Sequence, residues 1–194
     1  MRLVVTQNIT LDGVIEATEG WFQPGDGEDQ GDILEVMQDA MDAESAMLLG
    51  RRTFEDFRAY WPEQTGDETG ITAKLNAVPK HVVSTTMDDP GWENSIVERD
   101  LLEAARALKA ADGDECVTTG SMSLMAPLIS AGLVDEFRLF VYPVWLGKGE
   151  RLFEGRLDLE TLETRAFRSG VTLLRLSPQG DPPPASDFDL SAHP

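Results

Sequence analysis

The strongest constraint on the fold is a repeated alternation of short apolar runs with helix-forming segments. The apolar runs are compact, as buried parallel strands are, and they occupy residues 2–7, 46–49, 81–84 and 115–118. Between them lie segments with helical spacing of apolar residues, most clearly residues 100–111, where Asp100 can cap the helix. Strands that alternate with helices predict a mainly parallel sheet between two helical layers. We therefore expect a three-layer α/β/α domain.

The C-terminal part of the chain follows a different pattern. Residues 135–142 alternate as a strand does, and residues 161–168 and 170–177 alternate on either side of Gly170. This pattern predicts a terminal antiparallel hairpin. From Pro178 onward the chain is rich in proline and poor in apolar groups. We expect one domain over residues 1–177 and a disordered tail over residues 178–194.

The composition is strongly acidic and excludes several classes of partner. Lys and Arg number 16 against 35 Asp and Glu, giving a formal net charge of −19. Such a charge repels nucleic acid and anionic membranes, so any phosphate ligand needs a local basic patch. Cys116 is the single cysteine, which fits a reducing cytoplasm and a buried small side chain better than a nucleophile. No apolar run reaches bilayer length, so we expect a soluble cytoplasmic protein.

Three predicted strands end in polar turns that lead toward helices. These turns are Gly50-Arg51-Arg52-Thr53, Ser84-Thr85-Thr86 and Thr119-Gly120-Ser121. The carboxyl ends of parallel strands share one edge of the sheet, where ligands bind, and helix N-termini attract anions. Together the glycines, hydroxyls and arginines suit a phosphorylated dinucleotide, and an arginine with a hydroxyl neighbour suits a 2′-phosphate. The simpler alternative is a set of helix caps and solvated cations.

Other common nucleotide and hydrolytic sites have no sequence support. The chain lacks the G-x-G-x-x-G and G-x-x-x-x-G-K-[ST] motifs. His81 lies in a predicted strand and His193 in the tail, so no histidine pair or cysteine cluster is placed to bind a metal. Nothing supports His81 as the base of a hydrolase.

Taken together, several segments resemble the dihydrofolate reductase-like superfamily. Within it, the chain is most similar to the reductase (C-terminal) domain of the riboflavin-pathway deaminase-reductase and its small stand-alone relatives. The resemblance covers about residues 1–177 and rests on segments that follow the family order: Thr10-Leu11-Asp12-Gly13, Leu49 to Glu55, Lys80 to Ser84, Thr119-Gly120-Ser121, Gly132 to Glu136, and Pro143 to Gly149 with Leu152-Phe153.

The resemblance implies NADPH as cofactor and assigns a role to each of the three turns. The turn over residues 50–53 would hold the pyrophosphate and the 2′-phosphate end. Ser84 with Thr85 would lie beside the adenosine phosphate, and Gly120 with Ser121 would contact the pyrophosphate. The resemblance and the alternating C-terminal strands also indicate a homodimer.

The implied activity is hydride transfer to a small heterocyclic or sugar-derived substrate, as in pyrimidine reductases of the riboflavin pathway or in dihydrofolate reductase. Asp12 is a candidate for orienting the substrate or the nicotinamide, and Trp21 and Phe22 are candidates for a lid over it. Asp32 lies near the position of the carboxylate that holds the pterin in folate reductases, but it also suits a helix N-cap. The alternative function is a non-catalytic NADP(H)-binding module.

Overall fold

The computed structural model describes residues 1–16, 20–21, 31–64, 66–67, 69–153 and 155–183. The strands are β1 (Arg2–Thr10), β2 (Glu44–Gly50), β3 (Lys80–Val83), β4 (Ser95–Glu98), β5 (Glu115–Thr118), β6 (Glu136–Tyr142), β7 (Leu159–Ala166) and β8 (Thr172–Pro178). The helices are α1 (Gly31–Ala43), α2 (Arg51–Tyr60), the short 3-10 helix η2 (Trp61–Glu63), α3 (Ile71–Ala77), α4 (Leu101–Ala110) and α5 (Met122–Ser130).

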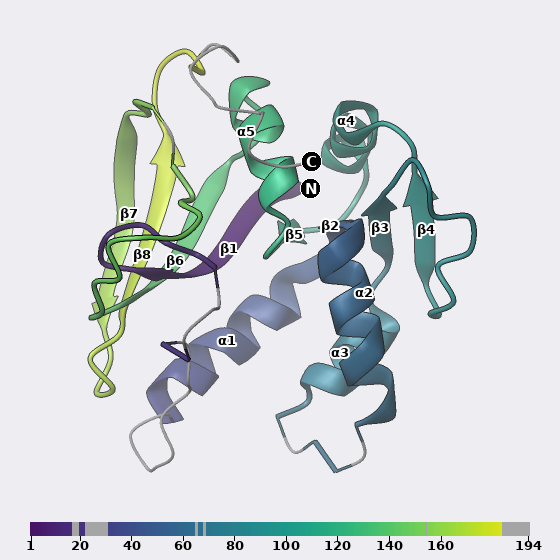
Figure 1. The fold of residues 1–194 in the computed structure, drawn as a ribbon, viewed down its shortest axis with the longest axis horizontal. Coiled ribbons are helices and arrows are strands. Elements are labelled where there is room, and N and C mark those ends of the chain that lie inside the picture. Colours follow the sequence, from purple (N-terminus) through teal and green to yellow (C-terminus); the bar gives the residue numbers. More distant parts are fainter. Residues whose placement is uncertain (17–19, 22–30, 65, 68, 154, 184–194) are drawn as a thin grey trace.

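All eight strands form one sheet in the order β4-β3-β2-β5-β1-β6-β8-β7. The pairs from β4 to β6 are parallel, whereas β8 is antiparallel to both β6 and β7. Helices α4 and α5 cover one face of the sheet, and α1, α2 and α3 cover the other (Figure 1). The predicted three-layer architecture, with antiparallel C-terminal strands, is confirmed.

Successive side chains of β2 point to opposite faces of the sheet, and both faces are covered, which explains why the apolar run is continuous. Leu48 packs into the core that β1 and β5 share with α4 and α5, whereas Met47 and Leu49 pack into the core that contains Phe54 of α2. Both faces of the strand are therefore buried, and every position between Ala46 and Gly50 excludes water.

Helix boundaries agree with the capping signals in one case and differ in another. The Asp100 side chain accepts a hydrogen bond from the Glu103 amide (2.9 Å), so the predicted cap of α4 is confirmed. Helix α1, in contrast, already includes Gly31, which places Asp32 inside its first turn. Asp32 instead accepts a hydrogen bond from the Arg168 amide (3.1 Å), in the turn between β7 and β8. The expectation that Asp32 is the N-cap is therefore wrong.

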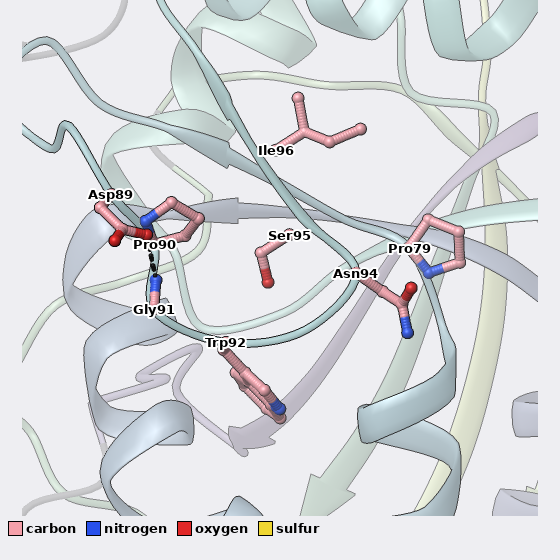
Figure 2. A pocket seen from close by; sticks show the side chains of 8 residues that line it. All are labelled: Pro79, Asp89, Pro90, Gly91, Trp92, Asn94, Ser95 and Ile96. Carbon is pink, nitrogen blue, oxygen red and sulfur yellow. Dashed lines mark hydrogen bonds between the residues drawn. The ribbon is translucent and has the colours of Figure 1, made fainter.

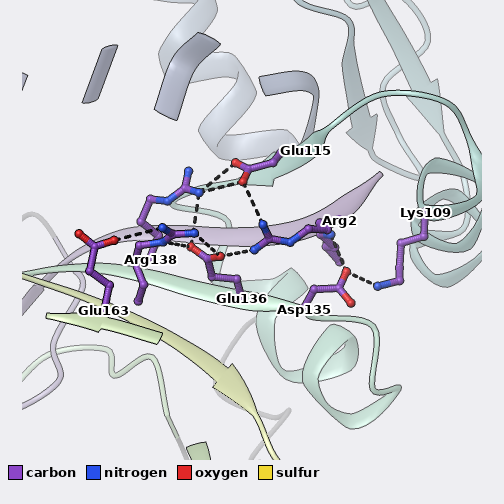
Figure 3. Close-up of polar contacts among 9 residues, drawn as sticks. Arg2, Lys109, Glu115, Asp135, Glu136, Arg138 and Glu163 are labelled. Carbon is purple, nitrogen blue, oxygen red and sulfur yellow. Dashed lines mark hydrogen bonds and ion pairs between the residues drawn. The ribbon is translucent and has the colours of Figure 1, made fainter. Parts of the chain in front are cut away.

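An ion-pair cluster joins the strands at the edge of the sheet where β1 begins (Figure 3). Arg138 of β6 donates two hydrogen bonds to Glu115 of β5 (2.9 and 3.0 Å), and Arg175 of β8 donates two to Glu136 (2.7 and 3.0 Å). Arg2 of β1 also pairs with Glu136. Burial raises the pKa of Glu136, but the surrounding guanidinium groups outweigh that effect and lower it. The cluster cross-links the starts of β1, β5 and β6, opposite the carboxyl ends of these three strands. β8 is antiparallel to β6, so it is the C-terminal part of β8 that meets the cluster.

The structure describes the first part of the expected tail. Pro178 is the last residue of β8, the Gln179 amide donates to the Asp158 carbonyl (2.8 Å), and Pro183 is buried. Residues 184–194 lie outside the described residues. Within the described ranges, no helix has both the length and the apolar character needed to cross a bilayer.

Candidate functional site

A cleft of about 600 Å³ opens at the carboxyl ends of β2, β3 and β5. All eight residues predicted to bind a dinucleotide line it: Gly50, Arg51, Arg52, Thr53, Ser84, Thr85, Gly120 and Ser121. The lining also includes residues that were not predicted to bind the dinucleotide: Val83, Thr86, Leu101, Met122, Ser123, Leu124 and Glu150. Most of these are chain neighbours of the three turns, whereas Leu101 and Glu150 come from other segments and carry no sequence signal.

The N-terminus of α2 forms one wall of the cleft. Helix α2 begins directly after β2, with Gly50 as the N-cap residue and no side chain capping it. The Gly50 amide donates to Ser121 Oγ (2.8 Å), which joins the turn after β2 to the turn after β5. Amides in an uncapped first turn are available to an anion, and the helix dipole adds partial positive charge. This wall is therefore suited to a phosphate group.

Arg51 and Arg52 supply the positive charge of the cleft, but they differ in their pairing. Arg51 forms an ion pair with Glu55 one helical turn later (2.9 Å), and its side chain is 45% exposed. Arg52 is exposed and has no ion-pair partner among the residues that the structure describes. Because Glu55 partly neutralises Arg51, Arg52 is the better candidate for a contact with a ligand phosphate.

The turn after β5 approaches α2 closely because residue 120 has no side chain. Gly120 has φ +69°, and a Cβ at this position would lie 2.9 Å from the side chain of Thr53. Helix α5 then begins at Met122 after Ser121, without a capping side chain. A second uncapped helix N-terminus therefore lies at the same cleft.

The turn after β3 is shaped by its own serine. Ser84 Oγ accepts hydrogen bonds from the amides of Thr86 (3.2 Å) and Met87 (3.0 Å). The Ser84 carbonyl accepts a hydrogen bond from Arg99 (2.8 Å). The turn is thus fixed, and Thr85 is exposed at it with its hydroxyl available as a donor.

Two other hollows of similar size have linings less suited to a phosphate. One of about 560 Å³ lies beside β4 (Figure 2), and Asp89, which accepts from the Gly91 amide (2.9 Å), is its only ionisable side chain in the described part of the chain. The other, of about 570 Å³, lies against α4 and contains His81, which is hydrogen-bonded to Glu98 (2.7 Å). Its carboxylates are Glu98, Asp100, Glu103 and Asp112. Charge therefore favours the cleft at α2 as the site for an anion.

Asp12 is engaged by the protein itself. Its side chain is 2% exposed and accepts hydrogen bonds from Thr10 Oγ1 (2.7 Å) and from the amides of Leu146 (3.2 Å) and Gly147 (2.7 Å). Burial raises its pKa, but these hydrogen bonds outweigh burial and lower the pKa to about 2. The ionised carboxylate joins the end of β1 to the segment after β6. A direct contact between Asp12 and a substrate would require the substrate to replace one of these hydrogen-bond donors. The catalytic role of Asp12 stays a prediction.

The other predicted catalytic and substrate residues do not line the cleft where the structure describes them. The Trp21 ring packs edge-on against Tyr142 at the end of β6 (centroids 5.4 Å apart), and its Nε1 donates to the Glu16 carbonyl (2.7 Å). Phe22 lies outside the described residues. Asp32 is held by the Arg168 amide, which is the main cause of its lowered pKa. The lid and pterin-holding roles stay predictions.

Cys116 agrees with its interpretation as a buried small side chain. It is fully buried in β5, and burial raises the pKa of its thiol to about 12. A thiol that stays protonated is a poor nucleophile.

Comparison with known proteins identifies relatives over most of the chain. The family model of the RibD C-terminal domain matches residues 2–173. Uncharacterized protein YyaP of Bacillus subtilis (strain 168) is 31% identical over 180 residues, which are 88% of this chain and 91% of that protein.

Solved structures resemble the fold. A putative riboflavin biosynthesis protein from Shewanella sp. PV-4 has a TM-score of 0.66 at 18% identity, over 93% of this chain and 100% of that one. A pyrimidine reductase-like protein from Corynebacterium diphtheriae has a TM-score of 0.62 at 18% identity, over 93% of this chain and 92% of that one. At this identity the likeness shows the fold alone.

Proposed function

Since the chain belongs to the family of the RibD C-terminal domain, we propose that it is an NADPH-dependent reductase. Its substrate class would be a small heterocycle or sugar-derived compound with a C=N or C=O bond to reduce, such as the pyrimidine intermediates of riboflavin synthesis. The names of the two similar structures, a riboflavin biosynthesis protein and a pyrimidine reductase-like protein, support this class.

The observation that carries the proposal is the convergence of three strand-end turns on one cleft. In a chain of net charge −19, that cleft contains two helix N-termini and the guanidinium of Arg52. Among the described residues no side chain caps either helix and none pairs with Arg52. A local positive site in an otherwise acidic protein favours the binding of an anionic ligand. The residues present therefore fit a phosphorylated dinucleotide.

Each wall of the cleft would hold a different part of NADPH. The uncapped amides of α2 and the Gly120-Ser121 turn would bind the pyrophosphate, and Arg52 would pair with the 2′-phosphate. Ser84 and Thr85 would donate hydroxyl hydrogen bonds near the adenosine phosphate. When bound, the reduced nicotinamide would supply the hydride.

The chain itself would orient the reactants and exclude water from them. Asp12 fixes the relation between the end of β1 and the segment after β6 through Leu146 and Gly147. The Trp21 ring packs against Tyr142 at the same end of β6. These contacts hold a wall beside the carboxyl ends of β1 and β6, where the substrate would meet the nicotinamide.

Turnover separates the reductase from the alternative, a non-catalytic NADP(H)-binding module. The test follows NADPH absorbance with the purified protein and a panel of pyrimidines, pterins and quinones. Substrate-dependent loss of absorbance supports the reductase. Tight binding of NADPH without turnover across the panel would favour the module.

We also infer a homodimer and a cytoplasmic location. β7 is an edge strand of the sheet, and Leu162 on it is 49% exposed, which is a large apolar side chain to leave in water. Light scattering after size-exclusion chromatography tests the assembly, since a monomeric mass would contradict the dimer.

A further inference from the structure

The proposed cofactor contacts leave Gln7, a buried polar residue that bonds the Gly120 turn, without a role. Gln7 lies in β1 and is 4% exposed. Its Oε1 accepts a hydrogen bond from the Gly120 amide (3.2 Å), and its Nε2 has no hydrogen-bond partner among the described residues. Because the Gly120 amide can only donate, this hydrogen bond fixes which end of the Gln7 side-chain amide carries the oxygen. The unpaired end is therefore the NH₂ donor.

The sheet leaves β1 without one of its neighbours near Gln7. The pairing of β1 with β5 ends at Val5 opposite Thr118, whereas the pairing of β1 with β6 continues to Thr10 opposite Tyr142. β1 thus extends beyond the end of β5, and Gln7 stands beside the turn that leads into α5. Ligands of α/β sheets bind outside the carboxyl ends of the strands, and Gln7 lies next to the carboxyl end of β5.

We propose that Gln7 Nε2 donates a hydrogen bond to an oxygen of the bound dinucleotide where the ligand passes the Gly120 turn. Gln7 is then a further binding residue of the site, and this inference rests on the proposed function. A buried donor without an acceptor destabilises the protein, and buried polar groups are paired in nearly all cases. An acceptor that arrives with the ligand completes the pairing. The competing explanation is that Gln7 only holds the Gly120 turn through Oε1.

Calorimetric titration with NADP⁺ separates the two roles by means of Gln7→Glu. This variant keeps an oxygen acceptor for the Gly120 amide but replaces the NH₂ donor by a second oxygen. Relative to the parent at the same pH, NADP⁺ affinity should fall about tenfold or more near pH 8. The ratio of parent affinity to variant affinity should decrease toward about pH 5, because the protonated carboxyl group again has a hydrogen-bond donor.

Two further variants keep the test decisive. Gln7→Met removes both the NH₂ donor and the oxygen that accepts from the Gly120 amide, without adding charge, and should bind NADP⁺ about tenfold more weakly at every pH. Thr118→Val is the matched control. Thr118 Oγ1 is also buried without a hydrogen-bond partner among the described residues, but Thr118 lies two residues before Gly120 and, unlike Gln7, is not the residue that bonds the Gly120 amide. Its affinity should equal that of the parent. Thermal melts verify that each variant is folded.

The outcomes are distinct. Parent-like affinity of Gln7→Glu near pH 8 overturns the inference, even if Gln7→Met binds weakly, because the acceptor alone then suffices. If Gln7→Glu does not fold, parent-like affinity of Gln7→Met overturns it. In both cases, binding of NADP⁺ by the parent leaves the proposed function standing. Absence of any NADP⁺ binding by the parent overturns both proposals.

Discussion

We expect the protein to prefer NADPH to NADH and the substitution Arg52→Ala to remove most of that preference. Arg52 is exposed at the start of α2, lines the cleft and has no ion-pair partner among the described residues. Under the proposed function, Arg52 pairs with the 2′-phosphate group that NADPH has and NADH lacks. Affinity for NADPH should fall, whereas affinity for NADH should barely change.

The size of the effect follows from the exposure of the two arginines. A charge-assisted hydrogen bond contributes about 1.5–3 kcal/mol, but an exposed pair lies toward the lower end, so we expect about a tenfold loss. Arg51→Ala should cost less, about threefold, because Glu55 already holds its guanidinium at 2.9 Å. The NADPH preference of the parent should also shrink as ionic strength rises.

Isothermal titration calorimetry with both cofactors measures these changes directly. Arg106→Ala is the matched control, since it makes the same change in net charge at an exposed position of α4 that does not line the cleft. If Arg52→Ala and Arg106→Ala lose the same NADPH affinity, the effect comes from the change in net charge and not from a contact at Arg52. Unchanged NADPH affinity in the Arg51→Ala, Arg52→Ala double variant would refute the assignment of this turn.

Four further predictions concern stability and the substrate side. Asp12→Asn should lower the melting temperature at neutral pH, because the pKa of the carboxylate is lowered from 3.8 to about 2 and the ionised group stabilises the fold above its ordinary pKa. The parent loses this stabilisation as the pH falls toward 2, so the melting temperature of the variant should depend less on pH in that range. Burial raises the pKa of Glu44 from 4.5 to about 7, so stability falls as pH rises through that window, and Glu44→Gln should melt higher than the parent at about pH 8 but not at about pH 4. Truncation after Pro183 should leave the melting temperature unchanged, whereas truncation after Ser177 should lower it because the end of β8 is lost; equal melts would contradict this. Trp21→Phe should reduce the quenching of tryptophan fluorescence by NADPH, and unchanged quenching would place Trp21 away from the ligand.

Local sequence patterns predicted the elements but not their order in the sheet. Continuous apolar runs such as Ala46–Leu49 identify buried strands, since both faces of such a strand must exclude water. The insertion of β5 between β2 and β1 depends on contacts between segments far apart in the chain, which no local period encodes. The boundary at Gly31 was missed for a related reason. The partner of Asp32 is the Arg168 amide, 136 residues away, and it competes with the capping role that local sequence favours.

The candidate site was predictable to the extent that it lies at strand ends. Carboxyl ends of parallel strands share an edge, so the turns at Gly50, Ser84 and Gly120 had to lie near one another. The hydrogen bonds of Asp12 were not predictable, because its donors include backbone amides 134 and 135 residues away. The role of Gln7 was not predictable, because it lies between two other polar residues, Thr6 and Asn8, and its donor without a partner among the described residues is visible only in the fold.

A crystal structure of the protein with bound NADP⁺ tests the central claim most directly. We predict that the dinucleotide lies in the cleft between the Gly50 and Gly120 turns, with its 2′-phosphate at Arg52 and its pyrophosphate at the N-termini of α2 and α5. Binding in the hollow against α4, or an empty cleft at saturating NADP⁺, would contradict the assignment of this cleft as the cofactor site.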